Sequence, residues 1–261
     1  MYQINFDSPV HVHFIGIGGI SMSGLAEVLL QEGFTISGSD SQRSELTRHL
    51  EEKGATVFYG QTADNIKPGI DVVVYTAAIH PDNAEFAAAR SAGIPMLTRA
   101  ELLGEIMRNY KTAIAVAGTH GKTTTTSMIS MILLEAQADP TISVGGILPE
   151  IGGNIRVGRS DLFLTEACEY TNSFLSFFPK IGIILNMDAD HLDFFKDIDD
   201  IRHSFREFAR LLPADGMLII NADTPKYDYV TEGLGCKIVT YALENQAVAD
   251  YTAANITYDE V

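Results

Sequence analysis

The chain has 261 residues, which is enough for one large domain or two modest domains with buried cores. Hydrophobic residues make up 46% and charged residues 20% of the chain, and this composition excludes disordered, collagen-like and coiled-coil proteins. Its 18 basic and 34 acidic residues give a formal net charge of −16, which excludes nucleic acid as the main binding partner.

The first part of the chain alternates short apolar or β-branched runs with longer helical patterns. This alternation is typical of parallel strands joined by crossover helices, and it predicts a Rossmann-like α/β domain over residues 1–110. Helices are expected to end at Gly33, Gly54 and Gly93. The predicted strands are residues 10–15, 34–38, 55–58, 71–75 and 94–97, and the predicted helices are residues 21–31, 44–53, 83–92 and 99–108.

The alternation starts again after residues 109–111, so we place a domain boundary between residues 110 and 111. We find no fixed-period repeat, low-complexity tract or extended linker. Residues 111–261 are therefore predicted to form a second α/β domain, with residues 251–261 as the start of a further strand. Its other predicted strands are residues 112–117, 141–144, 162–165, 181–185, 217–220 and 237–241, and its predicted helices are residues 122–136 and 198–212.

The cysteine content and the apolar runs indicate where the protein acts. Two cysteines, Cys168 and Cys236, cannot make a disulfide framework, and this predicts a reducing compartment. Residues 1–9 lack a basic cluster followed by an apolar stretch, and no run approaches the roughly 18 apolar residues of a membrane span. We therefore expect a soluble cytoplasmic protein with no membrane partner.

A first glycine-rich segment, from Gly16 to Gly24, lies between the first predicted strand and the first predicted helix. Glycines let the backbone approach a diphosphate, and the unpaired N–H groups of a helix start attract anions. A dinucleotide fingerprint has a third glycine where this chain has Ser21, although Asp40 stands where a ribose-binding acid is expected. The segment by itself fits a nicotinamide enzyme, another nucleotide-diphosphate binder, or a turn whose glycines serve packing alone.

A second glycine-rich segment, Gly-Thr-His-Gly-Lys-Thr-Thr at residues 118–124, is a shortened phosphate-binding loop, with Val116 where a full loop has glycine. Its glycines let the loop wrap phosphates, Lys122 reaches the β and γ oxygens, and the Thr123 hydroxyl suits Mg²⁺. Four consecutive threonines are a poor start for a helix, so ligand binding explains them better than stability. The segment predicts a site for nucleotide phosphates with Mg²⁺.

Acidic residues follow two later strands, and a phosphoryl-transfer site needs carboxylates for its metal. Glu166 ends one predicted strand, as a metal ligand or as a solvated strand-end carboxylate, and Glu169 is less well placed. The acidic cluster at residues 186–193 follows the next strand and could hold a second cation, with His191 either a ligand or a structural residue. Zinc held by His191, Cys168 and a carboxylate is a rival, but the usual zinc spacings are missing, and Cys168 is more simply a small buried hydrophobe.

Together these motifs resemble the Mur ligase family. The resemblance rests on residues 13–24, 37–40, 118–124, 166–170 and 186–193, and it extends from about Val10 to the last residue. It implies that the first loop binds the UDP part of UDP-N-acetylmuramate rather than NAD, through Gly16, Gly18, Gly19, Ser21, Met22, Ser23 and Asp40. It implies that the second loop holds ATP in a P-loop-type ATPase domain, through Gly118, Thr119, His120, Gly121, Lys122, Thr123 and Thr124.

The resemblance also implies a reaction that belongs to the synthesis of peptidoglycan precursors. The lactyl carboxylate of UDP-N-acetylmuramate takes the γ-phosphoryl group of ATP, and the amine of L-alanine attacks the acyl phosphate to form an amide. Carried over by matching position, Lys122, Glu166 and His191 are the expected catalytic residues. Lys122 contacts the phosphates, Thr123 and Glu166 hold one Mg²⁺, and His191 with Glu166 holds a second.

One departure from the family concerns length. Similar ligases continue through the rest of the ATPase domain and a C-terminal ligase domain that closes over the site. We therefore expect a truncated chain, without the C-terminal domain, that keeps both phosphate sites and ligates poorly or not at all. The alternatives are an NAD-dependent dehydrogenase built on the first loop, a non-catalytic nucleotide-binding module, and a recycling ligase that attaches a peptide to the same sugar nucleotide. The Gly-Ile-Gly-Gly sequence of the first loop weakly disfavours the recycling ligase.

Overall fold

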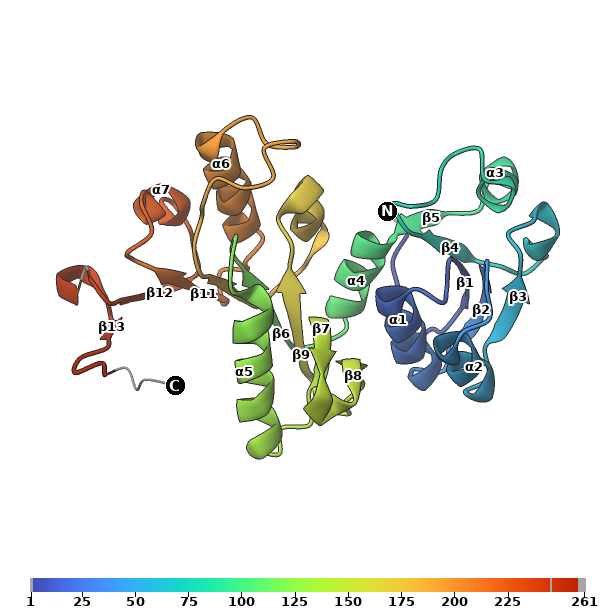
Figure 1. Ribbon diagram of the computed structural model, residues 1–261, viewed down its shortest axis with the longest axis horizontal. Coiled ribbons are helices and arrows are strands. Elements are labelled where there is room, and N and C mark those ends of the chain that lie inside the picture. The colour runs from blue at the N-terminus through green and yellow to red at the C-terminus, as the bar shows by residue number, and fades with distance from the viewer. Residues whose placement is uncertain (1, 245, 258–261) are drawn as a thin grey trace. The chain divides into compact units, whose positions relative to one another are not determined.

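The computed structural model of the chain, drawn in Figure 1, describes residues 2–244 and 246–257. Contacts between Cα atoms divide the chain into two units. The first unit joins the residues up to Tyr110 with Pro140–Ser160, and the second joins Lys111–Asp139 with the residues from Asp161 onward. The segment at 140–160 therefore groups with the first unit, whereas the sequence analysis placed it in a continuous second domain.

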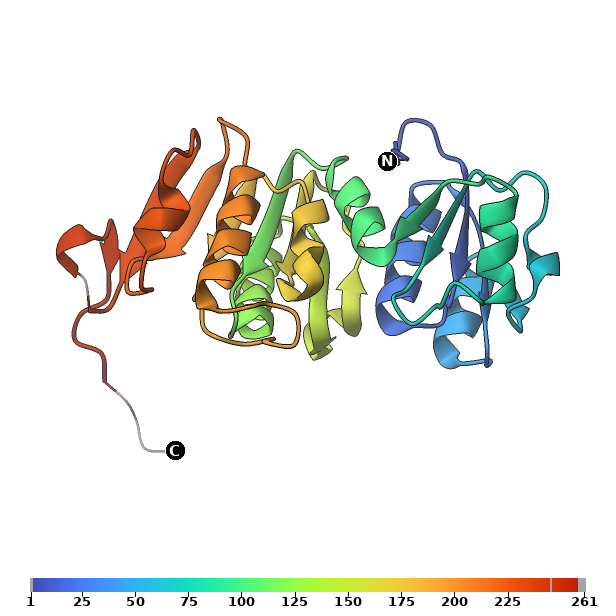
Figure 2. The same ribbon diagram turned by 90° about the horizontal axis from the view of Figure 1, so that it is seen from above.

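Parallel strands form the sheet of the first unit, in the order β3-β2-β1-β4-β5. The strand order reverses between β1 and β4, as in a Rossmann-like domain, so the prediction for this part of the chain is confirmed. Helices α1 and α3 lie on opposite faces of this sheet (Figure 2). The elements are β1 (His11–Ile15), α1 (Ile20–Gln31), β2 (Thr35–Asp40), α2 (Glu45–Glu52), β3 (Thr56–Tyr59), η1 (Ala63–Asn65), β4 (Val72–Tyr75), α3 (Ala84–Ser91), β5 (Met96–Thr98) and α4 (Arg99–Met107).

Parallel pairing also organises the second sheet, which has eight strands among the described residues in the order β13-β12-β11-β10-β6-β9-β7-β8. The pairs from β13 to β9 in this order are parallel, and β7 with β8 is antiparallel. The elements are β6 (Thr112–Ala117), α5 (Lys122–Glu135), β7 (Thr141–Leu148), η2 (Pro149–Ile151), β8 (Gly153–Arg156), β9 (Leu162–Ala167), η3 (Tyr170–Ser176), β10 (Ile181–Ile184), α6 (Ile198–Arg210), β11 (Met217–Asn221), α7 (Tyr227–Thr231), β12 (Lys237–Ala242), η4 (Gln246–Val248) and β13 (Tyr251–Thr252).

The core of the second unit positions the loops at one edge of its sheet. Val116, Leu164 and Ile183 from three adjacent strands are buried together, and Ile129 and Leu133 of α5 pack against them. Because β6, β9 and β10 are parallel and in register, their carboxyl ends meet at the same edge. The segments that follow these strands are thereby brought side by side.

The helices differ in whether a side chain caps their N-terminus. Side chains cap α2, α3, α4 and α6 through Ser44, Asn83, Thr98 and Asp197. Among the described helices of eight or more residues, α1 and α5 begin after a glycine and have no side-chain cap and no acidic residue in the first turn. Their first N–H groups and the positive ends of their dipoles are therefore not compensated by a side chain of the first turn.

The structure differs from the sequence prediction most clearly at residues 140–160. A single strand was predicted at 141–144, but β7 continues to Leu148 and turns back through η2 into β8. Ile155 of β8 packs on Gly24 of α1 so closely that a Cβ atom at position 24 would lie 2.2 Å from the Ile155 Cδ1. This contact is one reason why the hairpin groups with the first unit. The helix α7 was not predicted, and the strand predicted at 251–261 is observed at Tyr251–Thr252, with residues 258–261 outside the described chain.

A fully buried pair of polar side chains, a histidine and a glutamate, also lies in the first unit. His13 on β1 and Glu85 on α3 are both 0% exposed, and the His13 Nε2 lies 2.7 Å from the Glu85 Oε1. The Ser39 hydroxyl donates to the other carboxylate oxygen, and the His13 Nδ1 lies 2.8 Å from the Ser37 hydroxyl. The pair ties α3 to the middle of the sheet, and the sequence analysis did not predict it.

Candidate functional site

The loop between β6 and α5 is built on two glycines with backbone angles that other residues rarely adopt. Gly118 has a φ of +149°, and Gly121, which precedes α5, has a φ of +81°. A Cβ atom at Gly118 would lie 3.0 Å from the Cβ of Leu185 and 3.4 Å from the backbone nitrogen of Asn186. Glycine at position 118 therefore permits both the turn and the close approach to the segment after β10.

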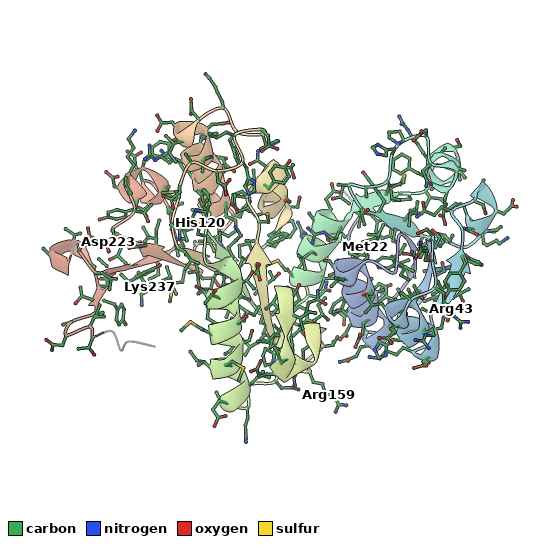
Figure 3. All side chains as sticks on the ribbon, in the orientation of Figure 1. Met22, Arg43, His120, Arg159, Asp223 and Lys237 are labelled. Atoms are coloured by element: carbon green, nitrogen blue, oxygen red, sulfur yellow. The ribbon has the colours of Figure 1, made fainter. Side chains whose placement is uncertain are left out.

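Side chains tie this loop to the segment after β10. The Asn186 side chain bonds to both backbone groups of His120: the His120 N–H donates to Oδ1 at 2.8 Å, and Nδ2 donates to the His120 carbonyl at 3.0 Å. The Asp188 N–H donates to the Thr119 hydroxyl at 2.9 Å. The loop is thus held in shape by residues 66–69 positions later in the chain, just after the adjacent parallel strand. Figure 3 shows His120 at the start of α5.

Lys122, the first residue of α5, has its ammonium group directed back over the loop. Its Nζ donates to the Gly118 carbonyl at 2.6 Å and to the Thr119 carbonyl at 3.2 Å. It also lies 2.9 Å and 3.2 Å from the two carboxylate oxygens of Glu169. The Lys122 side chain is 16% exposed and that of Glu169 is 2% exposed, so this is a largely buried ion pair.

Thr123 and Glu166 form the second polar pair of the site. The Thr123 hydroxyl donates to the Glu166 Oε2 at 3.0 Å, across 43 residues of sequence. Glu166 comes from the end of β9 and Thr123 from the uncapped first turn of α5. A hydroxyl and a carboxylate beside unpaired helix N–H groups are suited to a cation and an anion bound together.

His191 lies beside Glu169 in this structure. The His191 Nε2 is 3.8 Å from the Glu169 Oε1, and its ring lies 4.7 Å from that of Tyr170, centroid to centroid. The Tyr170 hydroxyl donates to Asp193 at 2.8 Å, and this hydrogen bond raises the pKa of the Tyr170 phenol. His191 has a φ of +53°, a strained conformation for a residue with a side chain. The carboxylate that faces His191 is therefore Glu169, whereas the sequence analysis paired His191 with Glu166.

The first glycine-rich loop bonds mainly to itself and to β2. The N–H groups of Gly16 and Ile17 both donate to the Ser39 carbonyl, at 2.8 and 2.9 Å. The Gly18 N–H donates to the Asp40 carboxylate at 2.8 Å, and a Cβ atom at position 18 would lie 2.7 Å from the same oxygen. Glycine at position 18 is thus required by the packing of Asp40, and the predicted binding residue Asp40 holds the loop.

The predicted binding residues at the start of α1 differ in exposure. Met22 and Ser23 are 1% and 5% exposed, and the Ser23 hydroxyl donates to the Ile20 carbonyl. The Ser21 hydroxyl is half-buried and accepts a hydrogen bond from Arg99 at 3.3 Å. Gly19 precedes the helix as its N-cap, without a side-chain cap. The start of α1 therefore presents backbone N–H groups rather than these side chains.

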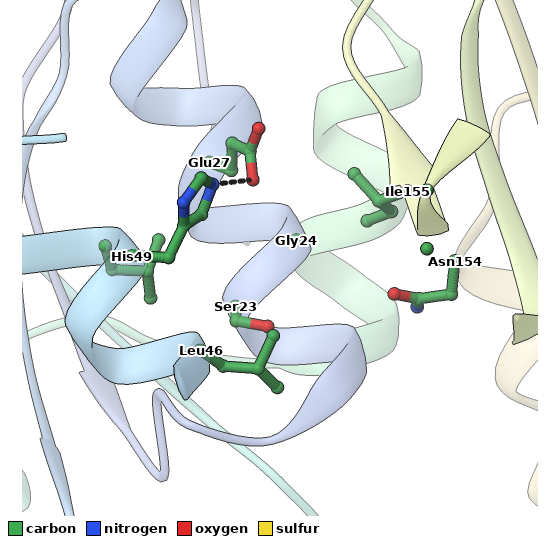
Figure 4. Close-up of a pocket in the computed structure, with 10 residues that line it drawn as sticks. Ser23, Gly24, Glu27, Leu46, His49, Asn154 and Ile155 are labelled. Atoms are coloured by element: carbon green, nitrogen blue, oxygen red, sulfur yellow. Dashed lines mark ion pairs between the residues drawn. The ribbon is translucent and has the colours of Figure 1, made fainter. Parts of the chain in front are cut away.

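A small cavity of about 140 Å³ lies beside α1 within the first unit (Figure 4). The Glu27 carboxylate at its rim pairs with His49 at 3.5 Å and with Lys53. Because Glu27 has these partners, its charge is already balanced by neighbouring side chains. The cavity is lined by Ser23, Gly24, Glu27, Leu46, His49, Leu50, Gly152, Gly153, Asn154 and Ile155.

Comparisons with known proteins agree with this geometry. A model described as the Mur ligase family catalytic domain matches residues 11–111, and one described as the Mur ligase middle domain matches residues 116–261. The second match covers more than half of the chain. The chain belongs to the Mur ligase family. Both glycine-rich loops fall inside the two matched regions.

Individual Mur ligases are similar along the whole chain. UDP-N-acetylmuramate–L-alanine ligase from Agathobacter rectalis is 66% identical over 260 residues, which is 100% of this chain and 56% of that protein. Solved structures of UDP-N-acetylmuramate-alanine ligase from Thermotoga maritima and of UDP-N-acetylmuramate:L-alanyl-gamma-D-glutamyl-meso-diaminopimelate ligase from Neisseria meningitides match 90% of this chain, with TM-scores of 0.74 and 0.79 and identities of 29% and 28%. These matches cover 53% and 78% of those structures. The chain spans just over half the length of the curated relative.

The site of this Mur ligase chain contains residues that the sequence analysis ranked low or did not single out. Glu169 was judged less well placed than Glu166, but it is buried against Lys122. Asn186 was only part of an acidic cluster, but its side chain holds the loop between β6 and α5. The available signal was their position after strands β9 and β10, at the same sheet edge as the loop.

Cys168 is partly exposed, so its interpretation as a small buried hydrophobe is wrong, whereas Cys236 is buried and burial raises the pKa of its thiol. Within residues 2–244 and 246–257, no three His, Cys, Asp or Glu side chains gather as a metal-binding group. No helix in the described part of the chain is long and apolar enough to cross a membrane.

Proposed function

We propose that this chain is the substrate- and nucleotide-binding part of an ATP-dependent ligase that joins L-alanine to UDP-N-acetylmuramate. The observation that carries the proposal is the pairing of the Thr123 hydroxyl with Glu166, 3.0 Å apart, at the uncapped start of α5 beside Lys122. Its support from relatives is the 66% identity to a protein named UDP-N-acetylmuramate–L-alanine ligase over the full length of this chain.

The donor set fits Mg²⁺ as a companion of the nucleotide. Hydroxyl and carboxylate oxygens are the hard ligands that Mg²⁺ prefers, and Thr123 and Glu166 supply one of each. When bound, Mg²⁺ supplies positive charge to the phosphate oxygens of the nucleotide. We propose that Thr123 and Glu166 hold this ion and that His191 with Glu166 holds a second.

The residues of the chain mainly position the reactants and balance their charge. The lactyl carboxylate oxygen bonds to the γ-phosphorus as the bond to ADP breaks, and the alanine nitrogen then attacks the acyl carbon, releasing phosphate and a proton. Lys122 and the first N–H groups of α5 neutralise the nucleotide phosphates, while Asn186 keeps the loop in shape. The N–H groups at the start of α1 bind the diphosphate of UDP by the same electrostatics.

We further propose that the protein acts in the cytoplasm on these small molecules, without nucleic acid or membrane partners. Its two cysteines, too few for a disulfide framework, and the excess of acidic over basic residues support this.

Parallel calorimetric titrations with UDP-N-acetylmuramate, ATP with Mg²⁺, and NADH test the proposal. Lys122→Ala should weaken ATP binding by about 100-fold, as expected for loss of a partly buried charge pair, and leave UDP-N-acetylmuramate binding unchanged. Lys111→Ala is the matched control, because Lys111 is 82% exposed and pairs with Asp161 on the surface. Unchanged ATP binding in Lys122→Ala would refute the role of this loop, and NADH binding without sugar-nucleotide binding would favour the dehydrogenase.

A further inference from the structure

Glu169 is an unusual neighbour for a group that binds phosphate. Its carboxylate is 2% exposed, and both of its oxygens lie within 3.2 Å of the Lys122 ammonium. A buried carboxylate without a positive partner is strongly unfavourable, so Glu169 depends on the Lys122 ammonium. The proposed reaction gives Glu169 no role of its own.

The hydrogen bonds of Lys122 leave no spare donor for a phosphate group. An ammonium has three N–H donors, and Lys122 directs them to the Gly118 carbonyl, the Thr119 carbonyl and the Glu169 carboxylate. Of these acceptors, the carboxylate is the charged one. A phosphate oxygen that contacts Lys122 therefore competes with Glu169 for the same positive charge.

The surroundings of the pair add to this competition. Glu166 lies at the same edge of the sheet, bonded to Thr123, and Asp188 and Asp190 follow β10. A nucleotide without a metal ion would bring several more negative charges to this edge. A divalent cation that arrives with the nucleotide cancels two of them, which reduces the repulsion from a buried carboxylate.

We propose that Glu169 is a positioning residue that makes the binding of a nucleoside polyphosphate conditional on a divalent cation. By holding Lys122 against the loop, it disfavours the metal-free nucleotide and so selects the metal-bound form. This inference rests on the proposed function, because it assumes that the loop binds a nucleotide. It assigns to the site a specificity that Lys122, Thr123 and Glu166 alone do not explain.

The test is calorimetry of ADP binding to the full chain, once with excess Mg²⁺ and once with EDTA. We expect the original chain to bind ADP at least about 100-fold more tightly with Mg²⁺. Glu169→Gln should lower this ratio about tenfold or more, through tighter binding in EDTA. Glu135→Gln, which removes the same charge from the exposed far end of α5, should leave the ratio unchanged.

A second variant guards against a folding defect in Glu169→Gln. Glu169→Asp keeps the negative charge, but its side chain is one methylene shorter and the carboxylate lies farther from Lys122. Its ratio of ADP affinities with Mg²⁺ and with EDTA should therefore lie between those of the original chain and Glu169→Gln. If both variants keep the affinity ratio of the original chain, or if the ratio falls only because ADP binds more weakly in Mg²⁺, the role of Glu169 is refuted but the proposed function is not. Absence of ADP binding by the original chain in both solutions would instead overturn the proposed function, and this inference with it.

Discussion

The buried contact between His13 and Glu85 makes the sharpest prediction about stability. Glu85→Ala removes a carboxylate that is 0% exposed and that accepts hydrogen bonds from the His13 ring and the Ser39 hydroxyl. Both partners would remain buried without their acceptor. Leaving a buried polar group without its partner costs about 1–3 kcal/mol, and two such groups remain, so we expect Glu85→Ala to lower the free energy of unfolding of the first unit by about 4 kcal/mol.

Glu45→Ala is a matched control for this prediction. Glu45 also lies in the first turn of an eight-residue helix, α2, but its side chain is 94% exposed and its partner Arg48 is 3.7 Å away. A surface pair of this kind contributes about 0–1 kcal/mol. Urea-dependent hydrogen exchange of the β1 and β2 amides measures the stability of the unit that holds both residues. Equal losses in the two variants would refute the argument that burial makes the His13–Glu85 pair costly to break.

Two further predictions concern packing and pH. Gly24→Ala would place a Cβ atom 2.2 Å from the Ile155 Cδ1, so it should destabilise the first unit by about 1–3 kcal/mol. In a double-mutant cycle Ile155→Ala should remove part of this cost, because it deletes the Cδ1 contact but keeps the Ile155 Cβ, 2.9 Å from the new methyl group; additive effects would contradict the predicted clash. Burial raises the pKa of Tyr110 to about 12 from its ordinary value of 10.0, so the unfolded chain ionises first as the pH rises. The contribution of Tyr110 is therefore complete below pH 10 and is lost between pH 10 and 12, by about 2–3 kcal/mol. The urea concentration at the midpoint of unfolding should therefore fall less steeply between pH 10 and 12 in Tyr110→Phe than in the original chain. An equal fall in both proteins would exclude ionisation of Tyr110 as a cause of the loss of stability.

Local signals in the sequence were sufficient for much of the fold. The alternation of apolar runs with helical patterns predicted parallel strands and crossover helices, because side-chain periodicity reflects the backbone on which it lies. Both glycine-rich loops were found at the transitions from β1 to α1 and from β6 to α5. The residue types of Lys122 and Thr123 already indicated phosphate and cation chemistry, since few structural roles need that combination at a helix start.

Residues far apart in the sequence were brought together only by the tertiary structure. Glu169 contacts Lys122 across 47 residues of sequence, and Glu85 contacts His13 across 72. No local motif or side-chain periodicity in the sequence predicts either contact. The hairpin of β7 and β8 groups with the first unit because Ile155 fits against a glycine of α1. The sequence by itself determined most of the strands and helices and the place of both glycine-rich turns, because these depend on neighbouring residues. Which carboxylates are buried, and against which cations, was decided by the packing of the sheets, because burial depends on every element that covers a side chain.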